Sequence, residues 1–409
     1  MFQPGLCSRV RMFSGHGVRK YLPLPTYLRR WRLQNGGAAC VVCVQSGGSH
    51  AKRKYNAERA MVIKIYSWLV GSQHSLMISF SFLATITMAA AQTPSPLVAG
   101  PIVAPGAVLE QLFDGGFWTE GPAVGPDGRI YFCDITMTFA SGMEAGNIWV
   151  FDPASQKTSI FRSPSGMAAG IKFDREGRMV VTQGADFGSR SVIRTDMKSG
   201  KTTILAGLYK GRPFNAPNDL DIDDQGRIYF TDPRYFGHES IEQPVSGVYR
   251  IDADNSVHLI LADVAKPNGI AVSPDQKTLY VAEHDTLLTD RRIDKVPQRN
   301  GFMRLLAYDL AADGTAGNQR VLIDYGKEAG PDGLAVDVIG NIYAAIGAAS
   351  RRGVRVYTPA GQEIAYIPLP GETAVTNVAL ATRDGQTYLY ITAKKRLYRI
   401  RTLLPGRRL

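Results

Sequence analysis

The chain has 409 residues and a formal net charge of +11 at pH 7, with 47 Lys and Arg against 36 Asp and Glu. The excess positive charge lies near the amino terminus, because residues 1–60 hold 11 basic residues and one acid, Glu58, and residues 61–92 add only Lys64. Residues 93–409 contain 35 basic and 35 acidic residues, so their composition gives no support to binding of nucleic acid.

Residues 1–60 are rich in arginine and show no sustained apolar period. We interpret them as a basic extension, on the hypothesis that translation starts at Met61 or Met77. A mitochondrial-type presequence is the alternative. Three of the four cysteines also lie here, which leaves Cys133 as the single cysteine of residues 93–409 and excludes an intrachain disulfide framework there.

Residues 61–92 have the order of features of a secretory signal. Lys64 comes first, an apolar stretch follows over 76–88, and the small residues 89–91 precede Gln92. The stretch is short for a membrane anchor and contains Ser and Thr, so a cleaved signal is favoured over a retained anchor. The expectation is an exported protein, periplasmic or secreted, without stable membrane association after cleavage.

A turn followed by a short strand-like run recurs six times in residues 93–409. The six turns end at Gly128, Gly177, Gly226, Gln276, Gly340 and Gly385, with spacings of 49, 49, 50, 64 and 45 residues. Such a period is typical of a four-stranded propeller blade. The sequence therefore predicts an all-β, six-bladed β-propeller with four-stranded blades, folded as one domain over 93–409.

The strands of single repeats can be read from runs of β-branched and aromatic residues. The first repeat predicts strands near 121–125, 129–133, 147–151 and 158–161, and the third near 220–222, 228–231, 247–251 and 258–261. The strand before each turn is the innermost strand of its blade. Residues at the same position of these strands should therefore meet at one end of the central channel.

Five repeats carry an oxygen-bearing side chain eight residues before the turn: Glu120, Asn218, Asn268, Asp332 and Asn377. Each could be an ordinary turn or capping residue, but repetition at one position favours a shared site. Glu120, Asn218, Asn268 and Asp332 offer two carboxylates and two amide oxygens. Such a set favours a hard divalent cation, with calcium ahead of magnesium and with zinc or manganese as further alternatives.

The motifs Glu120-Gly121-Pro122, Asn218-Asp219, Asn268-Gly269 and Pro331-Asp332-Gly333 resemble those of the senescence marker protein, gluconolactonase and luciferin-regenerating enzyme family. The resemblance covers residues 107–402. It is strongest over 214–219 and 229–235, which look like bacterial gluconolactonase-type members. It implies a six-bladed propeller, a calcium-type ion at the channel mouth and hydrolysis of a lactone.

By this resemblance Glu120, Asn268 and Asp332 match metal ligands, and Asn218 matches a residue that binds the metal or holds substrate beside it. Asp332 also matches the residue assigned proton transfer. Two departures stand out. Ala216 replaces an arginine by which some members grip sugar hydroxyls, and Ala169 takes the inward position in the second blade, which predicts an opening for substrate there.

Further candidates for contact with the substrate are Asn377, Arg234 and His284. Residues 93–409 lack a Gly-x-Ser-x-Gly elbow, a His-Glu-x-x-His pair and a phosphate-binding glycine loop, which argues against a serine hydrolase, a zinc protease or a nucleotide enzyme. The predicted function is a metal-dependent lactonase acting on a small sugar-type lactone. The alternatives are hydrolysis of organophosphorus esters at the same site, or a non-catalytic calcium-containing propeller that binds sugar acids or a protein.

Overall fold

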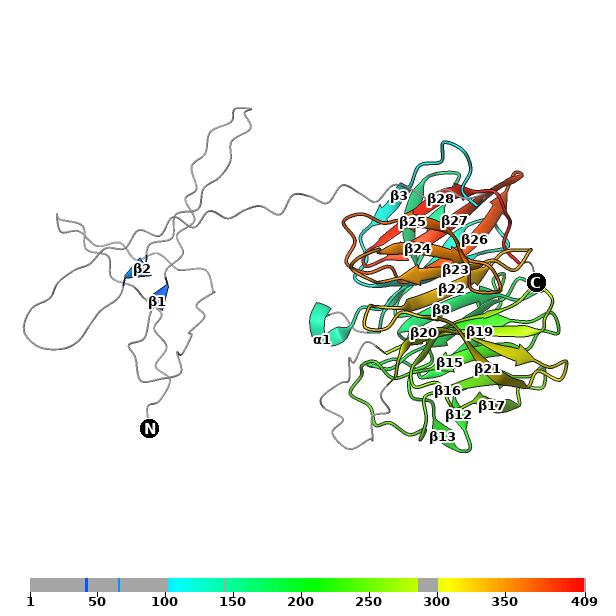
Figure 1. The fold of residues 1–409 in the computed structure, drawn as a ribbon. Helices are drawn as coiled ribbons and strands as arrows, with labels where there is room; N and C mark the ends of the chain where they lie inside the picture. The colour runs from blue at the N-terminus through cyan, green and yellow to red at the C-terminus, as the bar shows by residue number, and fades with distance from the viewer. Residues whose placement is uncertain (1–40, 43–64, 67–101, 143–144, 286–300, 408–409) are drawn as a thin grey trace, which may run out of the picture. The chain divides into compact units, whose positions relative to one another are not determined.

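The computed structural model describes residues 41–42, 65–66, 102–142, 145–285 and 301–407 (Figure 1). The chain separates into two units, Met1–Ala91 and Gln92–Leu409. In the first unit the described strands are Val41–Val42 (β1) and Ile65–Tyr66 (β2), which pair antiparallel. The remainder of the predicted basic extension and of the predicted secretory signal lies outside the described residues.

The second unit is a ring of six four-stranded antiparallel sheets, which confirms the predicted six-bladed β-propeller (Figure 1). Blade 1 is β4 (Thr119–Val124), β5 (Ile130–Asp134), β6 (Asn147–Asp152) and β7 (Lys157–Arg162). Blade 2 is β8 (Ala168–Phe173), β9 (Met179–Gln183), β10 (Ser191–Thr195) and β11 (Thr202–Ala206). Blade 3 is β14 (Leu220–Ile222), β15 (Ile228–Asp232), β16 (Gly247–Ile251) and β17 (Val257–Leu261).

Blade 4 is β18 (Pro267–Val272), β19 (Thr278–His284), β20 (Met303–Leu310) and β21 (Ala316–Asp324). Blade 5 is β22 (Pro331–Val336), β23 (Ile342–Ile346), β24 (Gly353–Tyr357) and β25 (Glu363–Pro368). Blade 6 is β26 (Asn377–Arg383), β27 (Gln386–Ala393), β28 (Arg396–Thr402) and β3 (Glu110–Asp114). A short hairpin of β12 (Leu208–Tyr209) and β13 (Arg212–Pro213) and the one-turn helix α1 (Thr138–Ser141) lie in connections.

The hydrophobic core lies between neighbouring blades. Each of the six blade-to-blade interfaces has its own cluster of buried side chains, such as the one that joins Phe214 and Phe230 of blade 3 to Val180 of blade 2. The second strand of a blade is buried on both faces, as in β5 and β15, where all five residues are buried. Continuous runs of apolar residues are expected for such strands.

The ring is closed by β3, the first strand of the propeller in the sequence. It pairs with β28 of the last blade, where Leu397 lies opposite Phe113 and Arg399 opposite Glu110. The Arg399 guanidinium lies 2.8 Å from the Glu110 carboxylate, which strengthens this pairing. The sequence pattern does not reveal this closure, because β3 stands outside the repeated turn-and-strand unit.

The innermost strands approach one another so closely that several positions accept only glycine. A Cβ atom on Gly269 would lie 2.3 Å from the carbonyl oxygen of Asp332, and one on Gly121 would lie 2.1 Å from that of Ala169. Neighbouring blades therefore touch through their backbones at the level of the predicted site, and this contact fixes the width of the channel.

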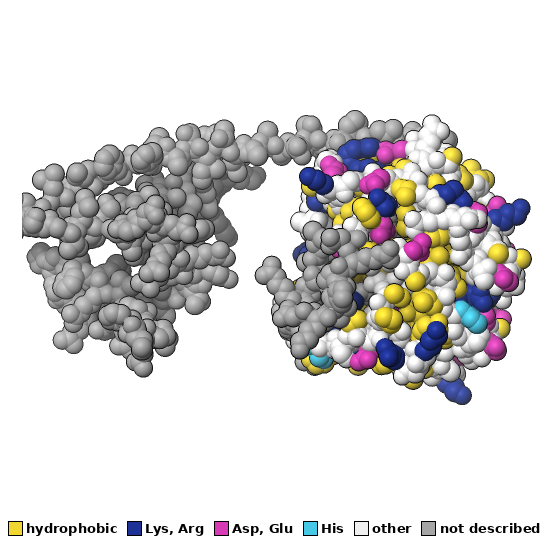
Figure 2. All heavy atoms as spheres, turned by 60° about the horizontal axis from the view of Figure 1, so that its bottom comes forward, with side chains coloured by type: hydrophobic (Ala, Val, Ile, Leu, Met, Phe, Trp, Pro, Cys, Tyr) yellow, Lys and Arg dark blue, Asp and Glu magenta, His cyan; other side chains and the backbone are white. Residues whose placement is uncertain are grey.

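The surface of the propeller carries mixed charge. Figure 2 shows basic and acidic side chains interspersed on the face that it presents. This agrees with the neutral composition of residues 93–409. Among the described residues, no helix has the length and apolar character needed to cross a membrane.

The close approach of the blades predicts a stability difference between two glycine substitutions. Gly269→Ala should lower the free energy of unfolding by about 1 to 3 kcal/mol, because the added methyl group collides with the backbone of blade 5. Gly317→Ala is the matched control, since a Cβ there meets no atom within 4 Å. It should be neutral or stabilising by up to about 1 kcal/mol in denaturant unfolding. Equal stability of the two variants would contradict the argument.

Candidate active site

Four of the five predicted channel residues lie on innermost strands and are more than nine-tenths buried. Glu120 lies on β4, Asn268 on β18, Asp332 on β22 and Asn377 on β26. Asn218 comes two residues before β14 and is partly buried. The fold thus carries residues from five different blades to one end of the channel, as the repeat predicts.

Contacts among the four buried side chains show that they share one site. The side chain of Asn377 hydrogen-bonds to Glu120, and that of Asn268 hydrogen-bonds to Asp332. Glu120 and Asp332 are close enough for the charge of Asp332 to raise the pKa of Glu120. For Asn218, the described part of the chain shows backbone contacts only: its N–H donates to the carbonyl of Thr231 over 2.9 Å, and its carbonyl accepts from the Thr182 hydroxyl.

Bulges in the innermost strands aim the site residues at the axis. The pairing register shifts between Glu120 and Ala123 in blade 1, and the corresponding stretch shifts in blades 2, 4 and 5. In a regular strand, residues three positions apart face opposite sides. The extra residue of a bulge changes this alternation, so that Glu120 and Ala123 both face the channel.

An acidic residue at the end of the second strand anchors the segment that leads into the site. Asp134 accepts hydrogen bonds of 2.9 Å from the backbone N–H groups of Phe117 and Trp118, just before Glu120. Asp232 does the same for Asn215 and Ala216, at 2.8 and 2.6 Å, just before Asn218. Glu283 accepts from Ala265 N–H at 3.1 Å in blade 4. Each carboxylate thereby fixes the backbone two to three residues ahead of a site residue.

Threonine hydroxyls tie neighbouring blades together at the same level. The Thr231 hydroxyl of blade 3 donates to the carbonyl of Asn268 in blade 4 over 2.8 Å and accepts from Asp219 N–H over 3.1 Å. The Thr376 hydroxyl of blade 6 donates to the carbonyl of Thr119 in blade 1 over 2.7 Å. These bonds fix the spacing of adjacent site residues.

Asp219 is a third buried carboxylate that the sequence analysis did not propose for the site. The Asn377 amide donates to it over 3.3 Å, and its charge raises the pKa values of Glu120 and Asp332. Burial raises the pKa of Asp219 itself to about 6, and the ammonium of Lys172 is the largest opposing influence. A signal was present in the sequence, since four of the other blades have glycine at this position: Gly121, Gly170, Gly269 and Gly333.

The electrostatics of the site fit a bound cation. Burial raises the pKa values of Glu120 and Asp332 well above their usual range. The Oδ1 atom of Asp332 is buried and has no hydrogen-bond partner. A buried, unpaired carboxylate oxygen is costly unless a positive charge compensates it. The oxygen ligands of Glu120, Asn218, Asn268 and Asp332 are of the kind that calcium prefers.

The candidate ion site depends on amide oxygens as well as carboxylates. Among the described residues, no group of three or more His, Cys, Asp or Glu side chains is placed to hold a metal ion. The predicted ligand set, with the two carboxylates of Glu120 and Asp332 and two amide side chains, stays a prediction. Asp219 acts on the site through its charge and through its hydrogen bond with Asn377.

His284 and Tyr235 form hydrogen bonds that connect them to residues of the site. The Nδ1 atom of His284 lies 2.9 Å from the carbonyl oxygen of Pro331, the residue before Asp332, and burial lowers the pKa of His284 to about 4. The imidazole is therefore neutral and donates from Nδ1. The Tyr235 hydroxyl donates to the carbonyl of His284 over 3.0 Å and accepts from the Asn268 amide over 3.0 Å. His284 and Tyr235 thus orient Asp332 and Asn268.

Arg234 is held inside the protein. Its guanidinium donates to the carbonyl of Asn215 over 2.8 Å and to the backbone carbonyl of Glu239. Its side chain is 5% exposed. The contact with Asn215 stabilises the segment that leads to Asn218. The suggested role of Arg234 in binding substrate stays a prediction.

Among the residues that the structure describes, the position where an opening was expected in the second blade is closely packed. Ala169 is 5% exposed and lies in a cluster with Ile135 and Met167, against which Trp118, Met137 and Phe236 pack. The space left by the small side chain is filled by larger apolar residues from other connections. This side of the mouth is therefore an apolar wall.

Comparison with known proteins places the chain in a family. The SMP-30/gluconolactonase/LRE-like region matches residues 118–395, more than half of the chain. The chain belongs to this family. The matched region contains all five predicted channel residues, whereas the closing strand β3 lies outside it.

A curated relative agrees with this assignment, and two solved structures share the fold. A gluconolactonase from Zymomonas mobilis is 28% identical over 316 residues, which cover 71% of this chain and 80% of the relative. The solved structure of a gluconolactonase from Xanthomonas campestris is similar with a TM-score of 0.60 at 24% identity, covering 76% of this chain and 99% of that one. Regucalcin from Agrobacterium tumefaciens, described as a calcium-binding protein, gives a TM-score of 0.55 at 21% identity, with coverages of 76% and 98%.

The neutral state of His284 predicts a specific dependence of stability on pH. Because the folded protein holds the pKa of His284 near 4, below its ordinary value of 6.5, the unfolded chain binds more protons between these pH values. The stability that His284 contributes is present above pH 6.5 and is lost as the pH falls toward 4. As the pH falls from 6.5 to 4, the free energy of unfolding of the wild type should decrease by up to about 1.4 kcal/mol per pH unit more than that of His284→Asn.

Denaturant unfolding at several pH values would measure this difference. The control is His258→Asn, which removes a histidine from the outer strand β17, where the side chain is 47% exposed. Its stability should follow the wild type within about 0.5 kcal/mol at every pH. Parallel curves for the wild type and His284→Asn would show that the imidazole is not held neutral by the fold.

Proposed function

We propose that this protein is a metal-dependent lactonase that opens a sugar-type lactone to its hydroxy acid. The protein is a lactonase by class, in line with its family and with the gluconolactonase that matches most of its length. The observation that carries the finer proposal is the buried pair of Glu120 and Asp332, with an Asp332 oxygen that has no hydrogen-bond partner. Two buried carboxylates of this kind would be compensated by a divalent ion.

The ion would be held by Glu120, Asn218, Asn268 and Asp332. Calcium is favoured by the all-oxygen ligand set and by the similarity in fold to regucalcin, with zinc, manganese and magnesium as alternatives. When bound, a divalent ion supplies Lewis-acid chemistry, polarising the lactone carbonyl and making a water more acidic. The two negative charges of Glu120 and Asp332 would balance the charge of the ion.

Asp332 handles the proton in the proposed reaction. Its carboxylate takes a proton from the attacking water as the water oxygen bonds to the lactone carbonyl carbon. The bond between that carbon and the ring oxygen then breaks, and the proton passes from Asp332 to the departing ring oxygen. The product is the open hydroxy acid. The hydrogen bond from Asn268 and the contact of His284 with Pro331 orient Asp332 for these transfers.

Other residues near the channel would position the substrate. Asn218 is less buried than the other four predicted channel residues, which suits a contact with substrate as well as with the ion. Asn377 bridges Glu120 and Asp219 through its side chain. The apolar wall of Trp118, Met137 and Phe236 would pack against the carbon-bound hydrogens of a ring substrate.

Replacement of the proton-transferring carboxylate should abolish turnover and leave the fold intact. Asp332→Asn should reduce the rate of aldonolactone hydrolysis by at least about 100-fold, because the amide cannot accept the proton. The rate would be followed by acid release with and without chelator. With chelator present the unfolding temperature should not fall, since the substitution removes a buried charge.

The matched control is Asp254→Asn in an exposed turn, which should keep the wild-type rate. Near-wild-type turnover by Asp332→Asn would refute the proton-transfer role. A wild type that hydrolyses no lactone with calcium, manganese, zinc or magnesium present would favour a propeller that binds ligands without catalysis.

The role of Glu120 can be tested without an activity assay. Calcium should raise the unfolding temperature of the wild type, since a ligand that binds the folded state stabilises it. Glu120→Gln removes one of the two anionic ligands and should require at least about tenfold more calcium for the same increase. Glu176→Gln, at an exposed turn, should respond as the wild type does. An identical calcium response of Glu120→Gln would exclude Glu120 as a ligand.

A further inference from the structure

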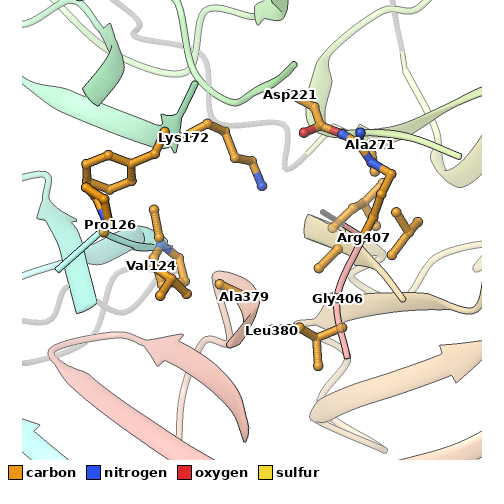
Figure 3. A pocket seen from close by; sticks show the side chains of 16 residues that line it. Val124, Pro126, Lys172, Asp221, Ala271, Ala379, Leu380, Gly406 and Arg407 are labelled. Atoms are coloured by element: carbon orange, nitrogen blue, oxygen red, sulfur yellow. The ribbon is translucent and has the colours of Figure 1, made fainter. Parts of the chain in front are cut away.

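The channel contains a cavity at the end opposite the candidate active site. It has a volume of about 730 Å³ and lies where the innermost strands reach their turns (Figure 3). Residues from all six innermost strands line it, together with Gly406 and Arg407 near the carboxyl end of the chain. This volume is within the range of small-molecule binding sites.

The wall of this cavity includes one ring of equivalent positions, three residues after each predicted channel position. The ring consists of Ala123, Lys172, Asp221, Ala271, Ala335 and Leu380. Four of the six are apolar, and the two charged members come from the adjacent strands β8 and β14. Apolar residues such as Phe173 and Leu334 also line the cavity, and its charged lining residues are Lys172, Asp221 and Arg407.

The charge of Asp221 is compensated within the protein. Its Oδ2 atom accepts hydrogen bonds from the Arg407 guanidinium over 2.9 Å and from Val272 N–H over 2.8 Å. Arg407 also donates to the carbonyl of Ile222 over 2.7 Å. Its backbone N–H donates to Val336 over 3.0 Å, which holds it across the channel. Asp221 and Arg407 therefore form a neutral pair, with their side chains 8% and 7% exposed.

Lys172 adds a positive charge that has no such partner in the cavity. Figure 3 shows its side chain extending into the open space, on the side facing Asp221 and Arg407. The described part of the chain gives its ammonium group no hydrogen bond or salt bridge, and its charge acts on Asp219 in the site above. The cavity thus presents one cation that has no hydrogen-bonded partner among the described residues, next to side chains that are mostly apolar.

We propose that this cavity binds an organic monocarboxylate with an apolar body, whose carboxylate pairs with the Lys172 ammonium. A single negative charge matches the net charge of the lining residues. A dianion would bring a second charge that Asp221 repels and that no further cation compensates. The hydroxyl groups of a sugar acid would lose water and find few side-chain partners, because Lys172, Asp221 and Arg407 are the only lining residues with polar side chains. The site is separate from the proposed lactonase site at the other end of the channel.

Isothermal titration calorimetry of the full chain with octanoate tests the proposal. The titration is performed with chelator present, so that it does not depend on an ion at Glu120 and Asp332. Octanoate should bind saturably with one site per chain. 1-Octanol lacks the charge and gluconate lacks the apolar body, and each should bind at least tenfold more weakly. Absence of saturable octanoate binding, or equally tight binding of 1-octanol, would overturn the proposal.

Substitutions locate the binding site. Lys172→Met keeps the length of the side chain and removes its charge, and it should weaken octanoate binding at least tenfold. Lys172→Arg keeps the charge and should stay within about threefold of the wild type. Lys201→Met, in the same blade and exposed, is the matched control and should bind as the wild type does.

Two outcomes would assign the octanoate to another place. Equal binding by folded Lys172→Met and the wild type would overturn the proposal, and so would loss of binding in Asp332→Asn, which would place the ligand at the other end of the channel. If Lys172→Met does not fold, Lys172→Arg and the comparison of octanoate with 1-octanol on the wild type decide the matter. A wild type that binds octanoate but hydrolyses no lactone would leave this inference intact and refute only the proposed function.

Discussion

Closure of the ring is the constraint on which the remainder of the structure depends. The five predicted channel residues come from five blades, so their distances are set by the number of blades and by how closely neighbouring blades approach. β3 holds the last blade to the first part of the propeller through its pairing with β28. The backbone contact at Gly269 and the Thr231 hydroxyl bond then fix the separation of adjacent strands. No single blade contains more than one of these five residues, so the site exists only in the closed ring.

The axis of the propeller concentrates charges that are costly to bury. Glu120, Asp219 and Asp332 lie at one end, and the fold offers them amide hydrogen bonds from Asn268 and Asn377. The positive charge of Lys172 lowers the pKa of Asp219, whereas burial raises it. The two ends of the channel are therefore linked electrostatically. Asp219 belongs to the end with the candidate active site, and Lys172 lines the cavity at the opposite end.

The sequence was sufficient for the fold and for most of the candidate site, because both follow from one repeated pattern. The strands of the third repeat agree with β14 to β17 within about one residue, and Glu120, Asn268, Asp332 and Asn377 lie together as expected. Asp219 was missed because it stands one residue after the repeated oxygen-bearing position, where four other blades have glycine. The opening expected at Ala169 is not found among the described residues, since a small side chain does not reveal which distant residues cover it. The closing strand was missed because it does not belong to a complete repeat.

Closure by the first strand also bears on the order of events during folding. Arg396 and Asp114, which meet in the closing pair, are 282 residues apart in the sequence. Blades 1 to 5 are formed from local hairpins, but closure has to bring together distant parts of the chain, and contacts of such separation are slow to form. Since the candidate site combines residues from blades on both sides of this junction, catalytic competence would be gained only when the last blade is completed. Recovery of turnover after dilution from denaturant would then follow ring closure, while spectroscopic signals of β-structure would return earlier.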